Sequence, residues 1–351
     1  MSKKNNNSNL IISAPLFLTE QITRLVERHP PVIAVGLPRS GSSFLSDIVS
    51  QLDDWYMFDD LYLYRQAKSI NAVDNDLTET QLDKLIFFLG WQIRARIKFG
   101  TYSVPNMELD DVDKMDAALK KTFKGKKIKW YELLEEWMLR LTHNEGCTHW
   151  GYKAPQDFMH LDLLEKIFPG VSYIYIKRDP RKMMASLKYV RDEDGNPGQY
   201  HPIFYSMYWK NASQTMFNHS KNHKVLQVKF EELIANPQTE AEKIATFLNT
   251  SISKDITVKK ANTSFSSKKR KTLTPTELWL CEKITKSTLE DNGYTSGQGK
   301  IRIFDLFDLI YTSLRFTSYQ FIRVFKQKSS LVSIMSFART ALPSFKPKEK
   351  M

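Results

Sequence analysis

Short runs of apolar, β-branched residues alternate along this chain with longer stretches in which apolar residues recur at helical spacing. The runs predict buried β-strands at residues 32–36, 150–153, 171–177 and 225–229. The longer stretches predict helices at 42–52, 81–98, 130–143, 157–167, 181–189, 203–218 and 239–248. Strands that alternate with helices are typical of a parallel sheet covered by helices on both faces. We therefore predict an α/β fold, a three-layer sandwich around a central parallel sheet.

The order of these elements predicts three regions along the chain. A long helical stretch, from about 60 to 145, separates the first strand from the next clear one. We expect it to be a helical insertion over the end of the sheet where substrates bind in such folds. The chain then divides into an N-terminal segment (1–29), a main domain (30–300) that contains the insertion, and a C-terminal tail (301–351). Turn formers at 192–202 and a polar, basic stretch at 264–275 predict two loops.

The tail mixes aromatic residues with arginines and lysines at roughly helical spacing between 302 and 339. This pattern predicts a basic amphipathic helix. Two interpretations stay open: the helix packs on the main domain, or it lies on an anionic membrane surface.

Composition is that of a globular protein, with 351 residues, 42% hydrophobic residues and a net charge of +12. Residues 301–351 hold nine Lys/Arg and three Asp/Glu, so half of that charge, +6, lies in the tail. Because the basicity is regional and no zinc-finger or RNP pattern accompanies it, we expect no nucleic-acid partner. Cys147 and Cys281 form no disulfide framework, and no run resembles a membrane span or a signal peptide. We expect a cytoplasmic protein, attached to a membrane surface if the tail binds lipid.

The stretch GLPRSGSSFL (36–45) follows the first strand and opens a helix with the glycine spacing of a phosphate-binding loop. Backbone N–H groups and a helix start make an anion site, to which the hydroxyls of Ser42 and Ser43 add donors. Ser42 stands where ATP-using loops have lysine, and Arg39 supplies a planar cation instead. We find no apolar strand that ends in an aspartate to hold Mg²⁺. A P-loop kinase of a small metabolite is therefore the second candidate function.

A second candidate anion site follows the predicted strand at 171–177. Arg178 stands at its carboxyl end, and Asp179 and Pro180 are suited to begin the next helix. Ser186 lies eight residues after Arg178, about two helical turns along, so both side chains are placed to hold one phosphate. Two anion sites at the ends of two parallel strands predict a nucleotide that carries phosphates at both ends.

Four segments occur in the order found in a known family: 36–45, 178–186, 228–249 and 288–294. On them the chain resembles the sulfotransferases that use 3′-phosphoadenosine 5′-phosphosulfate (PAPS). The PRSG loop resembles the tyrosylprotein and bacterial glycan or lipid branch. The resemblance implies a P-loop-like fold and transfer of a sulfuryl group to an acceptor hydroxyl, with release of adenosine 3′,5′-bisphosphate and no metal.

The resemblance also implies roles for individual residues. Arg39, Gly41 and the serines Ser40, Ser42 and Ser43 would bind the 5′-phosphosulfate, and Arg178 and Ser186 the 3′-phosphate. Lys153, in GYKAPQDF, would approach the sulfuryl group, and Asp60 of the pair Asp59–Asp60 would be the base. Phe230 replaces a tyrosine near the adenine. The basic run 266–271 either stands in for a late Arg-Lys-Gly triplet or is a solvated loop.

Several alternatives stay open at these positions. The acidic pair has the pattern of helix-capping residues, Lys153 that of a surface strand residue, and either His149 or His160 is an alternative base. His219 and His223 have a spacing that can bind metal, but with no third ligand nearby we expect a solvated face.

The acceptor class is not determined by the sequence. The aromatic and basic insertion suits a sugar, a lipid headgroup or an acidic peptide equally, and the tail favours a membrane-associated or lipid-linked acceptor. A third hypothesis is a noncatalytic protein on a degenerate nucleotide fold that associates with membrane or nucleic acid.

Overall fold

The structure is a computed structural model that describes residue 18 and residues 22–24, 28–100, 105–189, 200–258 and 272–326. Most of the predicted loops at 192–202 and 264–275, and the tail beyond Lys326, lie outside these residues. The chain divides into two compact units. One comprises residues 63–150 with the N-terminal 1–29, and the other comprises 30–62 with 151–351.

The second unit is built on a five-stranded sheet in the order β2-β3-β1-β4-β5. The strands are β1 (Val32–Gly36), β2 (Trp55–Phe58), β3 (His149–Lys153), β4 (Ser172–Lys177) and β5 (Val225–Lys229). β1 pairs in parallel with β3 and with β4, and β4 pairs in parallel with β5. The predicted fold class is confirmed. β2 was not predicted, because its four residues are followed at once by an acidic pair that resembles a helix start.

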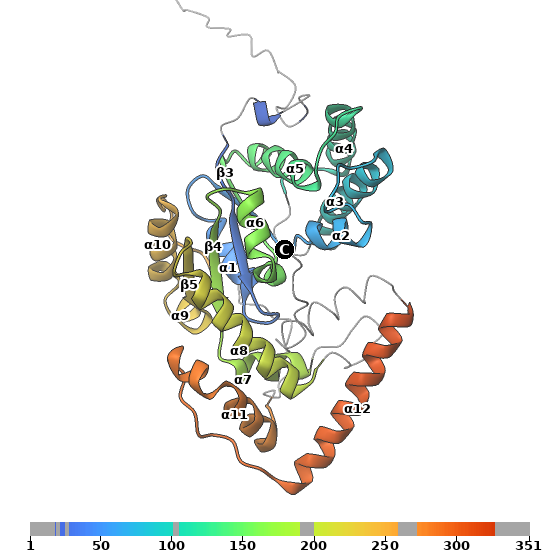
Figure 1. Cartoon of the computed structure of the whole chain (residues 1–351). Helices are drawn as coiled ribbons and strands as arrows, with labels where there is room; N and C mark the ends of the chain where they lie inside the picture. Colours follow the sequence, from blue (N-terminus) through green and yellow to red (C-terminus); the bar gives the residue numbers. More distant parts are fainter. Residues whose placement is uncertain are drawn as a thin grey trace, which may run out of the picture. The chain divides into compact units, whose positions relative to one another are not determined.

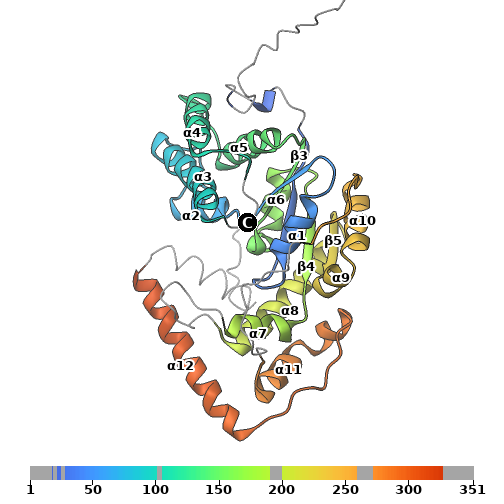
Figure 2. The same ribbon diagram turned by 180° about the vertical axis from the view of Figure 1, so that it is seen from behind.

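Alternate side chains of β4 explain why helices cover both faces of the sheet (Figures 1 and 2). Ile174 and Ile176 belong to a buried apolar cluster with α1 (Ser42–Val49) and α10 (Pro237–Leu248). Tyr173 and Tyr175 point to the other face. There the Tyr173 hydroxyl donates to the carbonyl of Leu161 in α6 (Leu161–Ile167), and the Tyr175 hydroxyl lies 3.2 Å from Ser213 Oγ in α8 (Pro202–His219).

The predicted single helix at 157–167 is wrong, because the structure has two separate elements there. A 3₁₀ turn, η3 (Pro155–Met159), comes first, and α6 begins only at Leu161. The break falls at His160, whose φ of −131° lies outside the helical region. The remaining helices of this unit are α7 (Pro180–Lys188), α9 (Phe230–Ala235), α11 (Pro275–Asp291) and α12 (Ile303–Lys326).

The first unit is helical. Its helices are α2 (Leu63–Ser69), α3 (Glu79–Phe99), α4 (Leu109–Phe123) and α5 (Trp130–Asn144), with a 3₁₀ turn, η2 (Ile22–Arg24). α3 begins at a capping box between Thr78 and Gln81 and ends at left-handed Gly100. Among the described residues of the whole chain, no helix is long and apolar enough to cross a membrane.

Candidate active site

The loop between β1 and α1 is a tight turn. The Ser40 N–H donates to the carbonyl of Leu37, and Arg39 and Gly41 adopt positive φ values of 71° and 99°. Gly41 is required here, because a Cβ at this position would come within 2.1 Å of the Phe230 ring. Ser40 is 2% exposed, and its hydroxyl has no hydrogen-bond partner among the described residues. A buried hydroxyl in that state is expected to be completed by water or a ligand.

The two predicted anion sites meet. Arg39 Nε donates to Ser186 Oγ at 3.1 Å, and Arg178 Nη1 donates to the carbonyl oxygen of Arg39 at 2.9 Å. The Arg178 guanidinium also lies over the Phe230 ring, 4.3 Å from its centroid. Burial lowers the pKa of Arg178. The structure thus brings two cations and a serine from β1–α1, β4 and α7 into one place, where they suit a phosphorylated ligand.

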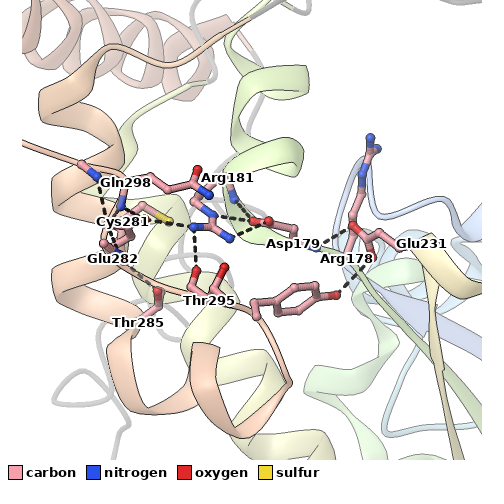
Figure 3. Close-up of polar contacts among 12 residues, drawn as sticks. Arg178, Asp179, Arg181, Glu231, Cys281, Glu282, Thr285, Thr295 and Gln298 are labelled. Carbon is pink, nitrogen blue, oxygen red and sulfur yellow. Dashed lines mark hydrogen bonds and ion pairs between the residues drawn. The ribbon is translucent and has the colours of Figure 1, made fainter.

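Arg178 is held in position by the residues that follow it. Asp179 caps α7 as predicted: its carboxylate accepts the Arg181 N–H at 2.9 Å, and Pro180 is the first helical residue. Arg181 pairs with Asp179 at 2.8 Å and with Glu282 of α11 at 2.9 Å. Figure 3 shows this network, with the Arg178 guanidinium pointing away from it. The end of β4 is therefore tied to α11.

Glu282 extends the network to the segment after α11. Its carboxylate accepts three successive backbone N–H groups, from Gly297, Gln298 and Gly299, each at 3.1 Å. These donors and Arg181 lower the pKa of Glu282, against the desolvation that raises it.

Lys153 stands at the carboxyl end of β3 and links the loop to the acidic pair. Its Nζ lies 2.9 Å from Ser43 Oγ, 3.0 Å from Asp59 Oδ1 and 2.7 Å from Asp60 Oδ1. Lys153 is buried, so the alternative of a surface strand residue is wrong. Asp59 and Asp60 directly follow β2, so the alternative of helix-capping acids is also wrong. Along the chain, β2 comes first, the acidic pair follows it, and α2 begins only at Leu63.

The two aspartates differ in environment. The Asp59 side chain is 4% exposed and that of Asp60 is 27% exposed. Burial raises the pKa of Asp59, as does the neighbouring Asp60, while the Lys153 ammonium lowers it. Asp60 has a left-handed φ of 53° and accepts a hydrogen bond from the Tyr62 hydroxyl at 2.8 Å. Asp60 is the carboxylate that solvent, and hence a ligand, can reach.

No apolar strand ending in an aspartate was found in the sequence, but the structure contains one, because β2 leads directly into Asp59. Its carboxylate is paired with Lys153, however, so in this structure Asp59 neutralises a cation.

Of the two alternative bases, the structure places His149 away from Lys153. His149 begins β3, at the end of the strand opposite Lys153, where its ring stacks on that of His29 with centroids 4.2 Å apart. His160 joins η3 to α6. Sequence reasoning overlooked Asp157 in η3, which accepts a hydrogen bond from the Tyr152 hydroxyl and whose pKa burial raises to about 7. In the sequence, the only indication of Asp157 was that it is the acidic residue in GYKAPQDF. The basic run 266–271 lies outside the described residues.

A comparison with known proteins identifies the family of this chain. A family model described as "Sulfotransferase family" matches residues 30–254, more than half of the chain. The sulfotransferase domain of the Synechococcus PCC 7002 olefin synthase is 16% identical, with a TM-score of 0.47, and 78% of this chain and 97% of that chain are covered. Sulfotransferase STF9 from Mycobacterium avium is 15% identical, with a TM-score of 0.39 and coverages of 82% and 81%. A sulfotransferase from Alicyclobacillus acidocaldarius is 13% identical, with a TM-score of 0.40 and coverages of 75% and 94%. No curated protein sequence matches the chain.

Proposed function

Because the chain belongs to the sulfotransferase family, we propose that it moves a sulfuryl group from PAPS to an acceptor hydroxyl and releases adenosine 3′,5′-bisphosphate. The observation that carries this proposal is the contact between Arg39, Ser186 and Arg178, which joins the two anion sites at the ends of β1 and β4. A donor that carries phosphate at both ends of one nucleoside matches two linked sites better than ATP does.

The residues at the site fit such a donor. The loop N–H groups and the unpartnered hydroxyl of Ser40 would bind the 5′-phosphosulfate, next to Ser42 and Ser43 at the start of α1. Arg178 and Ser186 would bind the 3′-phosphate, and the Phe230 ring beneath Arg178 offers an apolar face for the base.

The chain's own groups account for the transfer. The acceptor oxygen bonds to sulfur as the bond between sulfur and the bridging oxygen breaks, and Asp60 takes the acceptor's proton. Arg39 stabilises the negative charge that develops on the bridging oxygen. Lys153 stabilises the sulfuryl oxygens and, through its pairing at 2.7 Å, holds Asp60 in place. No metal is required in this scheme, because fixed cations and positioning supply the stabilisation.

Calorimetric titration tests which nucleotide the protein binds. Wild-type protein is expected to bind adenosine 3′,5′-bisphosphate in the micromolar range and to prefer it to ATP with Mg²⁺. Arg178→Ala and Ser186→Ala remove hydrogen bonds to a charged group, so each is expected to weaken binding by about tenfold or more. Arg28→Ala is the matched control, since its side chain is 61% exposed in a surface ion pair.

The alternatives give different titrations. Preference for ATP with Mg²⁺ would make the small-metabolite kinase the favoured function. Absence of binding by either nucleotide would favour the noncatalytic scaffold.

We further propose that α12 holds the enzyme on an anionic lipid surface, which makes a membrane-associated or lipid-linked acceptor the favoured class. One side of α12 packs on the start of α8: Phe316 stacks with Phe204 at 5.4 Å, and Ser313 Oγ lies 3.0 Å from His201 Nε2. Another face carries exposed apolar residues: Ile303, Phe304, Phe307, Ile310, Tyr311, Leu314, Phe321 and Ile322. Phe304 is 85% exposed.

Charge supports lipid as the occupant of that face. Residues 301–351 carry a net +6, from nine Lys/Arg and three Asp/Glu. An apolar face with a surplus of basic residues is the combination by which amphipathic helices bind anionic bilayers. A second copy of the chain would repel this charge instead.

Vesicle sedimentation tests whether α12 binds anionic lipid. The full chain is expected to sediment with phosphatidylglycerol vesicles and to do so less at high salt, but not with phosphatidylcholine vesicles. The triple variant Phe304→Ser/Phe307→Ser/Leu314→Ser should lose this binding, whereas Phe99→Ser/Phe217→Ser, at exposed aromatic residues elsewhere, should retain it. Dimerisation of the lipid-free wild type that the triple variant abolishes, or DNA binding without lipid binding, would overturn the proposal.

A further inference from the structure

We propose that Glu165, His219 and His223 bind one divalent transition-metal ion of the zinc type, at a site separate from the transfer chemistry. Glu165 lies in α6, His219 is the last residue of α8, and His223 follows in the turn before β5. One ligand atom from each of the three lies within 4.8 Å of the others. The prediction that no third ligand lies near the histidine pair was wrong, because Glu165 is distant in sequence and only the packing of α6 beside α8 supplies it.

The distances fit a metal. His219 Nε2 lies 3.3 Å and His223 Nδ1 3.1 Å from the same carboxylate oxygen, Glu165 Oε1. Zinc bonds to nitrogen and oxygen ligands at about 2.0–2.2 Å with tetrahedral geometry, which separates neighbouring ligand atoms by about 3.3 Å. These separations suit one ion, and the two rings, which lie parallel in this structure, would turn so that both nitrogens face it.

Packing holds the two imidazoles beside one another. The rings of His219 and His223 stack at a centroid distance of 3.9 Å with an interplanar angle of 7°. The Tyr173 ring meets His219 edge-on at 5.4 Å and limits its rotation. Two imidazole nitrogens and one carboxylate oxygen are ligand types that Zn²⁺ binds in proteins.

The surroundings allow an ion to enter and favour its charge. The side chain of His219 is 8% exposed, whereas that of His223 is 37% exposed, so the site opens to solvent on one side. Asp162, also in α6, interacts electrostatically with His219 and adds negative charge. Two histidines and one carboxylate leave a fourth position for water.

The position of the site in the fold indicates what the ion does. Tyr173, which contacts His219, is near the start of β4, and Arg178 follows its end. At about 3.3 Å per residue these residues lie roughly 17 Å apart. The ion therefore joins α6 to the connection between α8 and β5 and stabilises the fold, while sulfuryl transfer proceeds without it.

The test uses the full chain after chelator treatment and dialysis, titrated with Zn²⁺ alone and, for the spectrum, with Co²⁺ alone. We expect one ion per chain, a rise in Tm on binding, and the visible absorption of low-symmetry Co²⁺. His223→Ala and Glu165→Gln should each weaken Zn²⁺ binding by about a hundredfold or more. Both side chains are partly exposed, so the variants are expected to fold.

His143→Ala, at the end of α5, is the matched control and should bind Zn²⁺ as wild type does. Failure of the wild type to bind Zn²⁺ would overturn the proposal, as would equal binding by wild type, His223→Ala and Glu165→Gln. Because none of these readouts uses PAPS or an acceptor, the result is independent of the proposed function.

Discussion

Replacement of Arg39 by asparagine is expected to lower kcat/KM for sulfuryl transfer by about a thousandfold or more. Loss of one preorganised donor to a developing negative charge costs about a hundred- to a thousandfold. Arg39 also carries a full charge and fixes Ser186 at 3.1 Å. Asparagine tolerates the left-handed φ of 71° better than most residues, so the loop should keep its shape. Radiolabelled PAPS and an acceptor found by turnover screening would measure the rate.

Two companion variants separate chemistry from folding. Arg39→Lys keeps the charge but not the planar fork, and it should recover part of the lost rate. Arg28→Ala, on the surface of the other unit, should leave the rate unchanged. Wild-type turnover by Arg39→Asn with an unchanged circular dichroism spectrum would exclude Arg39 from the catalytic machinery.

Asp60→Asn is expected to lower kcat by about a hundred- to ten-thousandfold, with little change in the binding of adenosine 3′,5′-bisphosphate. The amide cannot take the acceptor's proton, although it keeps the shape of the side chain that Tyr62 and Lys153 contact. The radiolabelled-PAPS assay and calorimetric titration with adenosine 3′,5′-bisphosphate measure these two effects, and the pH profile of kcat would be recorded for wild type and both aspartate variants.

Asp59→Asn is the control at the neighbouring carboxylate. It leaves Lys153 paired with Asp60 and should retain most of the activity. Burial raises the pKa of Asp59, so a base at Asp59 would place the acid limb above the ordinary aspartate range. An acid limb in that range, abolished by Asp59→Asn and not by Asp60→Asn, would transfer the role of base to Asp59.

Local patterns in the sequence were enough to predict much of the fold. β1 and β5 begin and end at the predicted residues, because their apolar runs are flanked by turn formers or charges. The cap at Asp179 and the proline after it predicted the start of α7 for the same local reason. The spacing of Gly36 and Gly41 also predicted a loop between β1 and α1, while anion binding by that loop stays a prediction.

Contacts between distant segments were not predictable in this way. β2 is short, and its strand character follows from pairing beside β3 and not from its own pattern. The stacking of Arg178 on Phe230 and the pairing of Lys153 with the acidic residues depend on which strand ends lie side by side. The resemblance to a family suggested neighbours, but only the folded chain gives their distances. Glu165 beside the histidine pair is the same kind of contact.

The Arg181–Glu282 ion pair makes α11 part of the support for the end of β4. The family match ends at residue 254, yet the carboxylate that holds Arg181 belongs to α11 and is itself held by the N–H groups of Gly297, Gln298 and Gly299. A chain cut at 254 would leave Arg181 next to Asp179 alone and remove a helix that packs on α8. A truncation designed to keep the proposed donor site must therefore carry the sequence through Gly299, well past residue 254, where the match to the family model ends.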